Sequence, residues 1–313
     1  MTMKFSITIP AFKRRFLKEA IDSVCRQTYT DWELIVVDDC SPEDLRSVVE
    51  PYLADGRVHY HRNAVNCGAV NVVDNWNICL KHCTGDYVIC MGDDDCMLPC
   101  CLEEYRKLVD AYPDLNVYHA WTEIIDENNA TVFIQQPRPE RESALSLLWN
   151  RWNSRWYQFI GDFCYNTSHL RDNNGYYKLP LAWGSDDVTA VRAAIGNGIA
   201  NTQRVCFQYR DNRQSITSSK NARIKLEATL LAYQWFRNYL DGLVPSTLSY
   251  EDRCYRASID SVCKKYYMSI GEDCMEDVHG NPFRMMFWYK QLKCFDFPMK
   301  MFVKWYFGSF SKV

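Results

Sequence analysis

The stretch Glu33-Leu34-Ile35-Val36-Val37-Asp38-Asp39-Cys40-Ser41-Pro42 decides the fold that this sequence predicts. Its first half is an almost continuous apolar run, which is typical of a strand buried on both faces of a parallel sheet. Ser41 and Pro42 favour the start of a helix, because serine caps helices and proline suits a first helical position. The apolar spacing of the next residues fits such a helix, with Leu45, Val48, Val49 and Tyr52 facing inward.

The segments on either side repeat this strand-then-helix pattern. We expect strands over residues 5–9, 58–61 and 87–91, and helices over 16–27, 69–81 and 103–111. A further strand over 115–121 is expected to turn through 126–129 into a hairpin with 131–135. From about residue 220 the pattern is helical and contains no strand alternation. The alternation predicts an α/β fold with a mainly parallel sheet flanked by helices and followed by a helical C-terminal extension.

Three polar clusters follow the predicted strands: Pro10-Ala11-Phe12, Asp38-Asp39 and Asp93-Asp94-Asp95. In such folds, ligands bind beyond the carboxyl ends of the strands, so we expect the clusters to converge. Adjacent carboxylates repel one another unless a positive charge lies between them, and Mg²⁺ or Mn²⁺ prefers oxygen ligands together with substrate phosphates. The alternative for the aspartate triplet is a solvated turn or a helix N-terminus.

Composition limits the function classes. The chain has 313 residues, a formal net charge of -3 and an isoelectric point near 6.1, which does not favour nucleic acid as a partner. We interpret the fifteen cysteines as reduced thiols, because they lack the paired C-x₂-C spacing of a zinc site. The apolar run after Met1 is too short for a secretory signal, so we expect a cytoplasmic protein.

With these clusters in place, the chain resembles the family 2 glycosyltransferases of the GT-A fold, a Rossmann-like fold. The resemblance covers about residues 5–218 and is most specific at Gln27-Thr28-Tyr29-Thr30-Asp31-Trp32-Glu33-Leu34-Ile35-Val36-Val37-Asp38-Asp39-Cys40-Ser41. Other matching pieces are Ile7-Thr8-Ile9-Pro10-Ala11-Phe12, Asn66-Cys67-Gly68, Gly85-Asp86-Tyr87-Val88 and the aspartate run. The resemblance implies a catalytic domain over 1–218, with a nucleotide-binding half over about 1–100 and an acceptor half over about 101–218. Residues 219–313 form the helical extension.

The resemblance also implies a nucleotide site. Asp39 corresponds to the carboxylate that accepts a hydrogen bond from the base, and the backbone of Pro10 and Ala11 to the floor beneath it. Asn66 and Gly68 occupy positions where this family passes close to the nucleotide. On the following helix Asn77 is a further candidate for contact with phosphate or acceptor. The alternative is a helix surface that is simply rich in asparagine.

The metal motif departs from the family pattern. Counted back from Pro99, Asp95 and Asp94 match the final two aspartates of the family, whereas the first falls on Gly92. We therefore expect Asp94 to be the direct ligand of Mn²⁺ or Mg²⁺, Asp93 to contact ribose or metal-bound water, and Asp95 to support them. This departure concerns how the roles are divided among the three aspartates, and not the presence of the site.

The catalytic base is expected in Trp183-Gly184-Ser185-Asp186-Asp187, ahead of a helix over 188–194. This segment resembles the family's Glu-Asp motif, with Ser185 in place of the glutamate and Asp186 as the base; the alternative is a helix cap. Trp183 is a candidate for acceptor contact. Arg210, ahead of Ser215-Ile216-Thr217, is a candidate phosphate ligand or a surface salt bridge. A Trp-rich segment could be an aromatic platform or core packing: Trp149, Trp152 and Trp156.

The tail over 283–313 mixes aromatic residues with lysines and is too interrupted to span a bilayer. It suits either the inner face of the membrane or a helical cap on the catalytic domain. The function expected is inverting transfer of a sugar from a nucleoside diphosphate, with UDP favoured, to a hydroxyl of a glycan or lipid-linked glycan of bacterial surface polysaccharide. The alternatives are a metal-dependent nucleotidyltransferase and a non-catalytic glycan-binding protein on a transferase fold.

Overall fold

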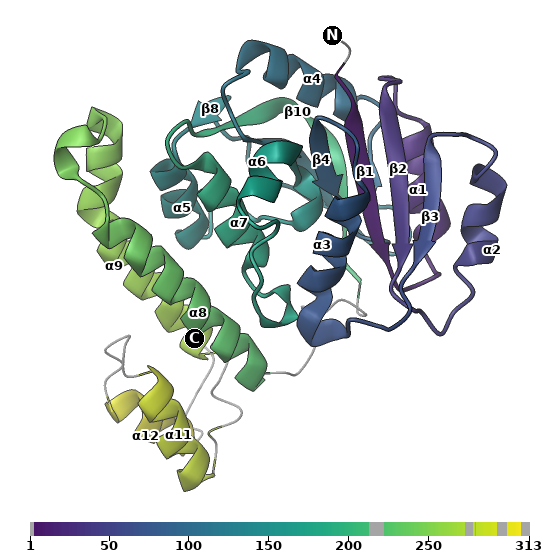
Figure 1. Ribbon diagram of the computed structural model, residues 1–313. Coiled ribbons are helices and arrows are strands. Elements are labelled where there is room, and N and C mark those ends of the chain that lie inside the picture. The colour runs from purple at the N-terminus through teal and green to yellow at the C-terminus, as the bar shows by residue number, and fades with distance from the viewer. Residues whose placement is uncertain (1–2, 213–221, 273–277, 279, 293–298, 308–313) are drawn as a thin grey trace.

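The computed structural model describes residues 3–212, 222–272, 278, 280–292 and 299–307. It consists of one twisted sheet with helices on both faces, followed by further helices that extend away from the sheet (Figure 1). The expected boundary at residue 218 and the segment Ser215-Ile216-Thr217 lie outside the described residues. The α/β class and the helical C-terminal part are confirmed.

The first half of the sheet is parallel, as predicted. Its strands run in the spatial order β3 (Val58–Arg62), β2 (Trp32–Asp38), β1 (Phe5–Ala11) and β4 (Tyr87–Cys90). All seven residues of β2 are buried, which explains the apolar run over residues 34–37. Alternate side chains of β2 enter the cores on opposite faces of the sheet. Ile35 and Val37 belong to one core, and Leu34 and Val36 belong to the other.

The second half of the sheet is mixed. The strand β9 (Phe163–Asn166) pairs antiparallel with both β4 and β6 (Val117–Ile125), and β10 (Ile199–Arg210) lies parallel to β6. The predicted hairpin between β6 and β7 (Thr131–Ile134) is confirmed. Two short strands that the sequence pattern did not predict pair with β10: β5 (Cys96–Met97) and β8 (Arg141–Glu142).

Helices cover the two faces unequally. The core on one face involves α1 (Leu17–Cys25), α2 (Arg46–Val49) and α4 (Cys101–Ala111). The other face packs against a larger set: α3 (Val72–His82), α5 (Ala144–Trp152), α6 (Thr167–Asp172) and α7 (Ser185–Ala194). The helix predicted to open at Ser41 begins only at Arg46; the Ser41 hydroxyl donates to the Phe12 carbonyl oxygen at 2.6 Å and accepts the Glu43 N–H at 3.1 Å.

The C-terminal helices α8 (Ala222–Asp241) and α9 (Tyr250–Glu272) form a long antiparallel pair that joins the larger core (Figure 1). Trp152 packs there against Phe236 and Tyr267, and the indole N–H of Trp149 donates to Ser258 at 2.9 Å. Trp152 and Trp156 thus belong to the larger core, and Trp149 packs against it. Two shorter helices follow, α11 (Pro282–Leu292) and α12 (Met299–Tyr306). Within the described ranges, none of the helices is long and apolar enough to cross a bilayer.

Candidate active site

The first predicted cluster assembles around Asp39, where β1 and β2 end. Its carboxylate is 6% exposed and accepts hydrogen bonds from the Asn63 amide at 2.8 Å and from the Cys67 backbone N–H at 3.0 Å. The Asp39 N–H donates to the Ala11 carbonyl, and the Asn66 amide donates to the Asp39 carbonyl at 2.6 Å. The strand ends and the loop over 63–68 are therefore held together at this edge.

The aspartate triplet lies beside this cluster. One oxygen of Asp93 accepts the backbone N–H groups of Phe12 and Lys13, both at 2.7 Å, directly after the strand that carries Pro10 and Ala11. Asp94 accepts the Asn212 amide at 2.6 Å and lies 3.9 Å from the Lys13 ammonium. Burial and the charge of Asp94 raise the pKa of Asp93 to about 6 and the pKa of Asp95 well above its usual range. A cation at this site would relieve that repulsion.

Gly92 explains the missing first aspartate of the motif. A Cβ at this position would lie 2.8 Å from one oxygen of Asp95 and 2.9 Å from one of Asp94, closer than real Cβ contacts. The carboxylates of Asp94 and Asp95 thus fold back over a backbone that has no side chain. An aspartate at Gly92 would require both to move.

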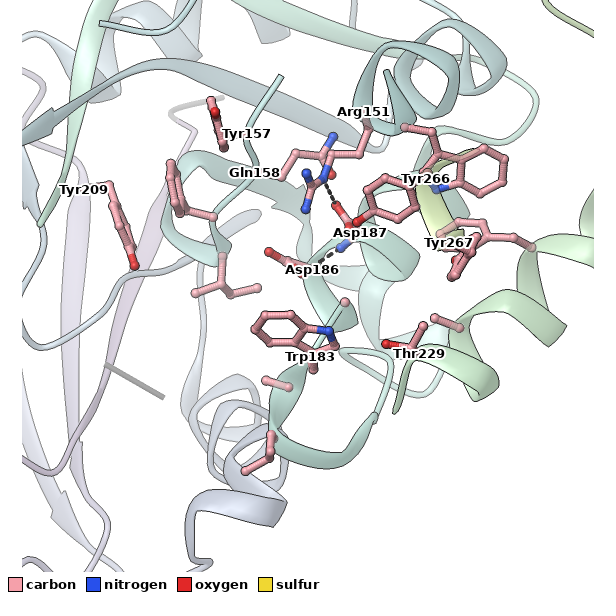
Figure 2. Close-up of a pocket in the computed structure, with 18 of the residues that line it drawn as sticks. Arg151, Tyr157, Gln158, Trp183, Asp186, Asp187, Tyr209, Thr229, Tyr266 and Tyr267 are labelled. Carbon is pink, nitrogen blue, oxygen red and sulfur yellow. Dashed lines mark hydrogen bonds and ion pairs between the residues drawn. The ribbon is translucent and has the colours of Figure 1, made fainter. Parts of the chain in front are cut away.

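A pocket of about 360 Å³ connects this cluster with the predicted base. Asp95 and Asp186, ninety-one positions apart, both line it. Figure 2 shows Asp186 between Tyr209 on one side and Tyr266 on the other, with Trp183 beneath it. The structure therefore places Asp95, Trp183 and Asp186 at one pocket.

Asp186 lies in the first turn of α7, beside a buried ion pair. Its Oδ1 accepts the Asp187 N–H at 2.9 Å, while the Asp187 carboxylate accepts the Arg151 Nε–H at 2.9 Å (Figure 2). Burial, followed by the charge of Asp187, raises the pKa of Asp186 to about 8, and the Arg151 charge opposes this shift. A carboxylate with a raised pKa is a stronger base once ionised.

The loop before α7 has an unusual backbone. Leu181 (φ 58°) and Ala182 (φ 54°) adopt the left-handed conformation, as does Gly184 (φ 83°). Non-glycine residues in this region are strained by about 1–3 kcal/mol each and concentrate at functional sites. The strained turn holds Trp183 at the pocket, where the Lys225 ammonium lies 4.5 Å from the indole centroid.

Two further predicted residues, Arg210 and Asn77, are engaged by other groups of the protein. Arg210 is 1% exposed; its guanidinium donates to the Asp94 carbonyl at 2.7 Å and forms an ion pair with the partly exposed Glu19 carboxylate at 3.0 Å. Asn77 uses its amide oxygen and nitrogen for the backbone N–H and carbonyl of Tyr176 at 2.8 and 3.2 Å, and does not line the pocket. Both amide atoms of Asn77 are thus occupied, and the phosphate or acceptor role proposed for this residue has no support in its placement.

Sequence reasoning missed most of the pocket wall. Arg151 is one such residue, although a charged residue on the apolar stripe of α5 signals a buried partner. Tyr209 and Phe159 are others; their rings stack with the centroids 3.7 Å apart. Five more lining residues come from α8 and α9, outside the predicted catalytic domain: Thr229, Ala232, Phe236, Tyr266 and Tyr267.

The family follows from comparison with known proteins. The model described as Glycosyl transferase family 2 matches residues 6–174, more than half of the chain. The chain belongs to this family. It has the GT-A fold, and both the predicted fold and the predicted family are confirmed.

Several relatives share part of the sequence. An uncharacterized glycosyltransferase of Haemophilus influenzae is 32% identical over 140 residues, 44% of this chain and 45% of that protein. The poly(ribitol-phosphate) beta-N-acetylglucosaminyltransferase TarS of Staphylococcus aureus is 25% identical over 219 residues, 68% of this chain and 36% of TarS. The Escherichia coli UDP-Glc:alpha-D-GlcNAc-diphosphoundecaprenol beta-1,3-glucosyltransferase WfgD is 25% identical over 229 residues, 72% of this chain and 84% of WfgD. The chain spans less than half the length of the first two relatives.

Solved structures show the same fold. The structure of TarS residues 1–349 in complex with UDP-GlcNAc matches this chain with a TM-score of 0.62 at 15% identity. The match covers 99% of this chain and 93% of the TarS chain. The mannosyltransferase PcManGT from Pyrobaculum calidifontis, in complex with GDP-Man and Mn²⁺, has a TM-score of 0.58 at 15% identity, with coverage of 99% and 89%. At this identity the likeness concerns the fold alone.

Proposed function

We propose that this glycosyltransferase inverts the anomeric centre as it moves a sugar from a nucleoside diphosphate to a hydroxyl group of a glycan. The observation that carries the proposal is the single pocket lined by both Asp95 and Asp186. Such an arrangement separates the group that binds the donor from the group that removes a proton, as inversion by direct displacement requires.

In this reaction the acceptor oxygen attacks C1 of the donor sugar while its proton passes to Asp186. The bond from C1 to the diphosphate oxygen breaks, and the diphosphate leaves with the electron pair. Asp187 and Arg151 keep Asp186 oriented through the hydrogen bond and ion pair described above. Lys13, at the edge of the aspartate cluster, is placed to offset charge that develops on the leaving group.

The aspartate triplet fits a divalent cation by its chemistry. Within the described parts of the chain, no group of three or more His, Cys, Asp or Glu is arranged as a complete metal cage. Mg²⁺ and Mn²⁺ at phosphate sites take only one or two carboxylates, together with substrate phosphates and water. Asp94, with Asp93 beside it, would hold the ion, which would stabilise the departing diphosphate. Asp95 supports both.

The donor is proposed to be a UDP-sugar, with its nucleotide at Asp39, Pro10, Ala11, Asn66 and Gly68. TarS, the neighbour with the higher of the two TM-scores, is complexed with UDP-GlcNAc, and the name of the relative WfgD specifies UDP-Glc. The acceptor is proposed to be a glycan, free or lipid-linked, of bacterial surface polysaccharide. The names of TarS and WfgD specify a polymer-linked and a diphosphoundecaprenol-linked acceptor, respectively.

The proposed location is the cytoplasmic face of the membrane. Large apolar side chains are exposed on α11 and at the end of α12, with Phe283 86% and Phe307 67% exposed. Lys290 and Lys300 lie on the same two helices. Aromatic and basic residues together suit the interface of an anionic bilayer. Cosedimentation with vesicles containing phosphatidylglycerol, compared with phosphatidylcholine alone, tests this placement.

The decisive test is Mn²⁺-dependent turnover of a panel of nucleotide sugars: UDP-glucose, UDP-N-acetylglucosamine and GDP-mannose. We expect one of them to be hydrolysed slowly without acceptor, with release of the nucleoside diphosphate. Absence of metal-dependent nucleotide binding across the panel would refute the proposal. Release of pyrophosphate from a nucleoside triphosphate would indicate a nucleotidyltransferase instead.

A further inference from the structure

One buried polar group in the pocket has no part in the reaction described so far. Gln158 lines the pocket and is 6% exposed, and neither its amide oxygen nor its amide nitrogen has a hydrogen-bond partner among the residues that the structure describes. Burial of an amide without partners is unfavourable, so native proteins rarely leave both atoms unpaired. An unpaired amide at the wall of a substrate pocket indicates that a ligand supplies the missing partners.

The chain around Gln158 is held from both sides. The Tyr157 carbonyl accepts the Arg138 guanidinium N–H at 2.7 Å, and the Phe159 N–H donates to Asp162 at 3.2 Å. The Phe159 ring stacks on Tyr209 of β10 at 3.7 Å. The position of Gln158 is thus fixed before any ligand binds, which lowers the entropic cost of recognition.

We propose that the Gln158 amide recognises a hydroxyl or acetamido group of a pyranose sugar bound in this pocket. The inference rests on the proposed function, because it assigns a sugar to the same pocket. A sugar hydroxyl is both donor and acceptor, so one such group can pair with the amide oxygen and a neighbouring one with the amide nitrogen. The rest of the wall suits a pyranose ring, since it combines the aromatic faces of Trp183 and tyrosines with polar groups that include Asp95 and Asp186.

The test compares Gln158→Met with Gln135→Met. Methionine keeps the length of the side chain and removes both hydrogen-bonding atoms. Gln135 is the matched control, because it is 3% exposed and its amide also lacks partners within the described part of the chain, but it is not among the residues that line the pocket. We expect Gln158→Met to lower kcat/KM roughly 10- to 100-fold with the nucleotide sugar that the wild type uses. Binding of the free nucleotide, measured by calorimetry, should stay within about two-fold, and Gln135→Met should match the wild type in both assays.

Two arms separate the two sugars. A loss in hydrolysis of the nucleotide sugar without acceptor assigns Gln158 to the donor sugar. A loss confined to transfer onto a para-nitrophenyl glycoside assigns it to the acceptor sugar. If Gln158→Met does not fold, monodeoxy analogues of the turned-over sugar on the wild-type enzyme replace it, and one of them should lose activity by the same factor.

Unchanged kinetics of Gln158→Met in an active enzyme would overturn the inference and leave the proposed function intact. A wild-type protein that binds no nucleotide sugar would overturn both. The two failures are therefore distinguished by the wild type alone.

Discussion

The two acidic clusters of the pocket differ in how their negative charge is compensated. Asp187 is paired with the buried Arg151, so the charge beside Asp186 is already balanced by the protein. Asp93 and Asp94 have instead backbone N–H groups, an amide and the more distant Lys13. A permanent counter-ion suits a group that must act as a base in every cycle. Incomplete compensation of charge suits a site that a metal-bound substrate completes.

The largest effect is expected for Asp186→Asn. An amide cannot take the acceptor proton, so transfer should fall by about 10³-fold or more, while nucleotide binding stays within about two-fold. Transfer is measured with the active nucleotide sugar and an acceptor, and nucleotide binding by calorimetry. Full activity of the variant would show that another group is the base.

Thermal stability provides the control for this variant. Because the pKa of Asp186 in the folded chain lies above its ordinary value of 3.8, the folded state binds more protons than the unfolded state between about pH 4 and 8. This group therefore contributes less stability as pH rises through that range. Asp186→Asn cannot ionise and so does not lose this stability. Its melting temperature at pH 8.5 should be at least that of the wild type, so its inactivity would not reflect unfolding.

The next largest effect is expected for Asp94→Asn. The variant removes a charge from the incompletely compensated cluster, so Mn²⁺-dependent binding of the nucleotide should weaken by about 100-fold. The measurement is nucleotide affinity at several Mn²⁺ concentrations. Asp110→Asn is the control, since Asp110 is an exposed partner of Arg106 on α4. Equal metal dependence in Asp94→Asn and the wild type would remove Asp94 from the metal site.

The contrast between the clusters was only half visible in the sequence. The aspartate triplet and Asp186 stand at strand and helix ends, where local pattern predicts them. Arg151 is paired with a residue thirty-six positions away, and the short strands β5, β8 and β9 depend on partners still more distant in sequence. Periodicity reports only the local environment, so long-range pairs and the contribution of α8 and α9 to the pocket could not be predicted from it.

A smaller effect is expected for Asp187→Asn. The Asp187 charge raises the pKa of Asp186, and its removal leaves Arg151 uncompensated nearby; both changes lower the pKa of Asp186. Activity requires ionised Asp186, so the acidic limb of the profile of kcat/KM against pH should move down from about pH 8 by roughly one unit. Arg151→Met should move it up. A limb that stays in place in both variants would show that this pair does not set the pKa of the base.

The smallest effect is expected for Gly92→Ala, which tests the other cluster by geometry alone. The new Cβ would force the carboxylates of Asp94 and Asp95 apart without altering any charge, since it would lie under 3.0 Å from both. These are the ends of flexible side chains, so the fold should persist and the Mn²⁺ concentration for half-maximal activity should rise only a few-fold, by less than 1.4 kcal/mol. Gly56→Ala is the control, because a Cβ there meets nothing within 4 Å. If Gly92→Ala instead shifts the profile of activity against pH and leaves the Mn²⁺ dependence unchanged, the two clusters are not independent. The substitution at the aspartate triplet would then have altered the ionisation of Asp186.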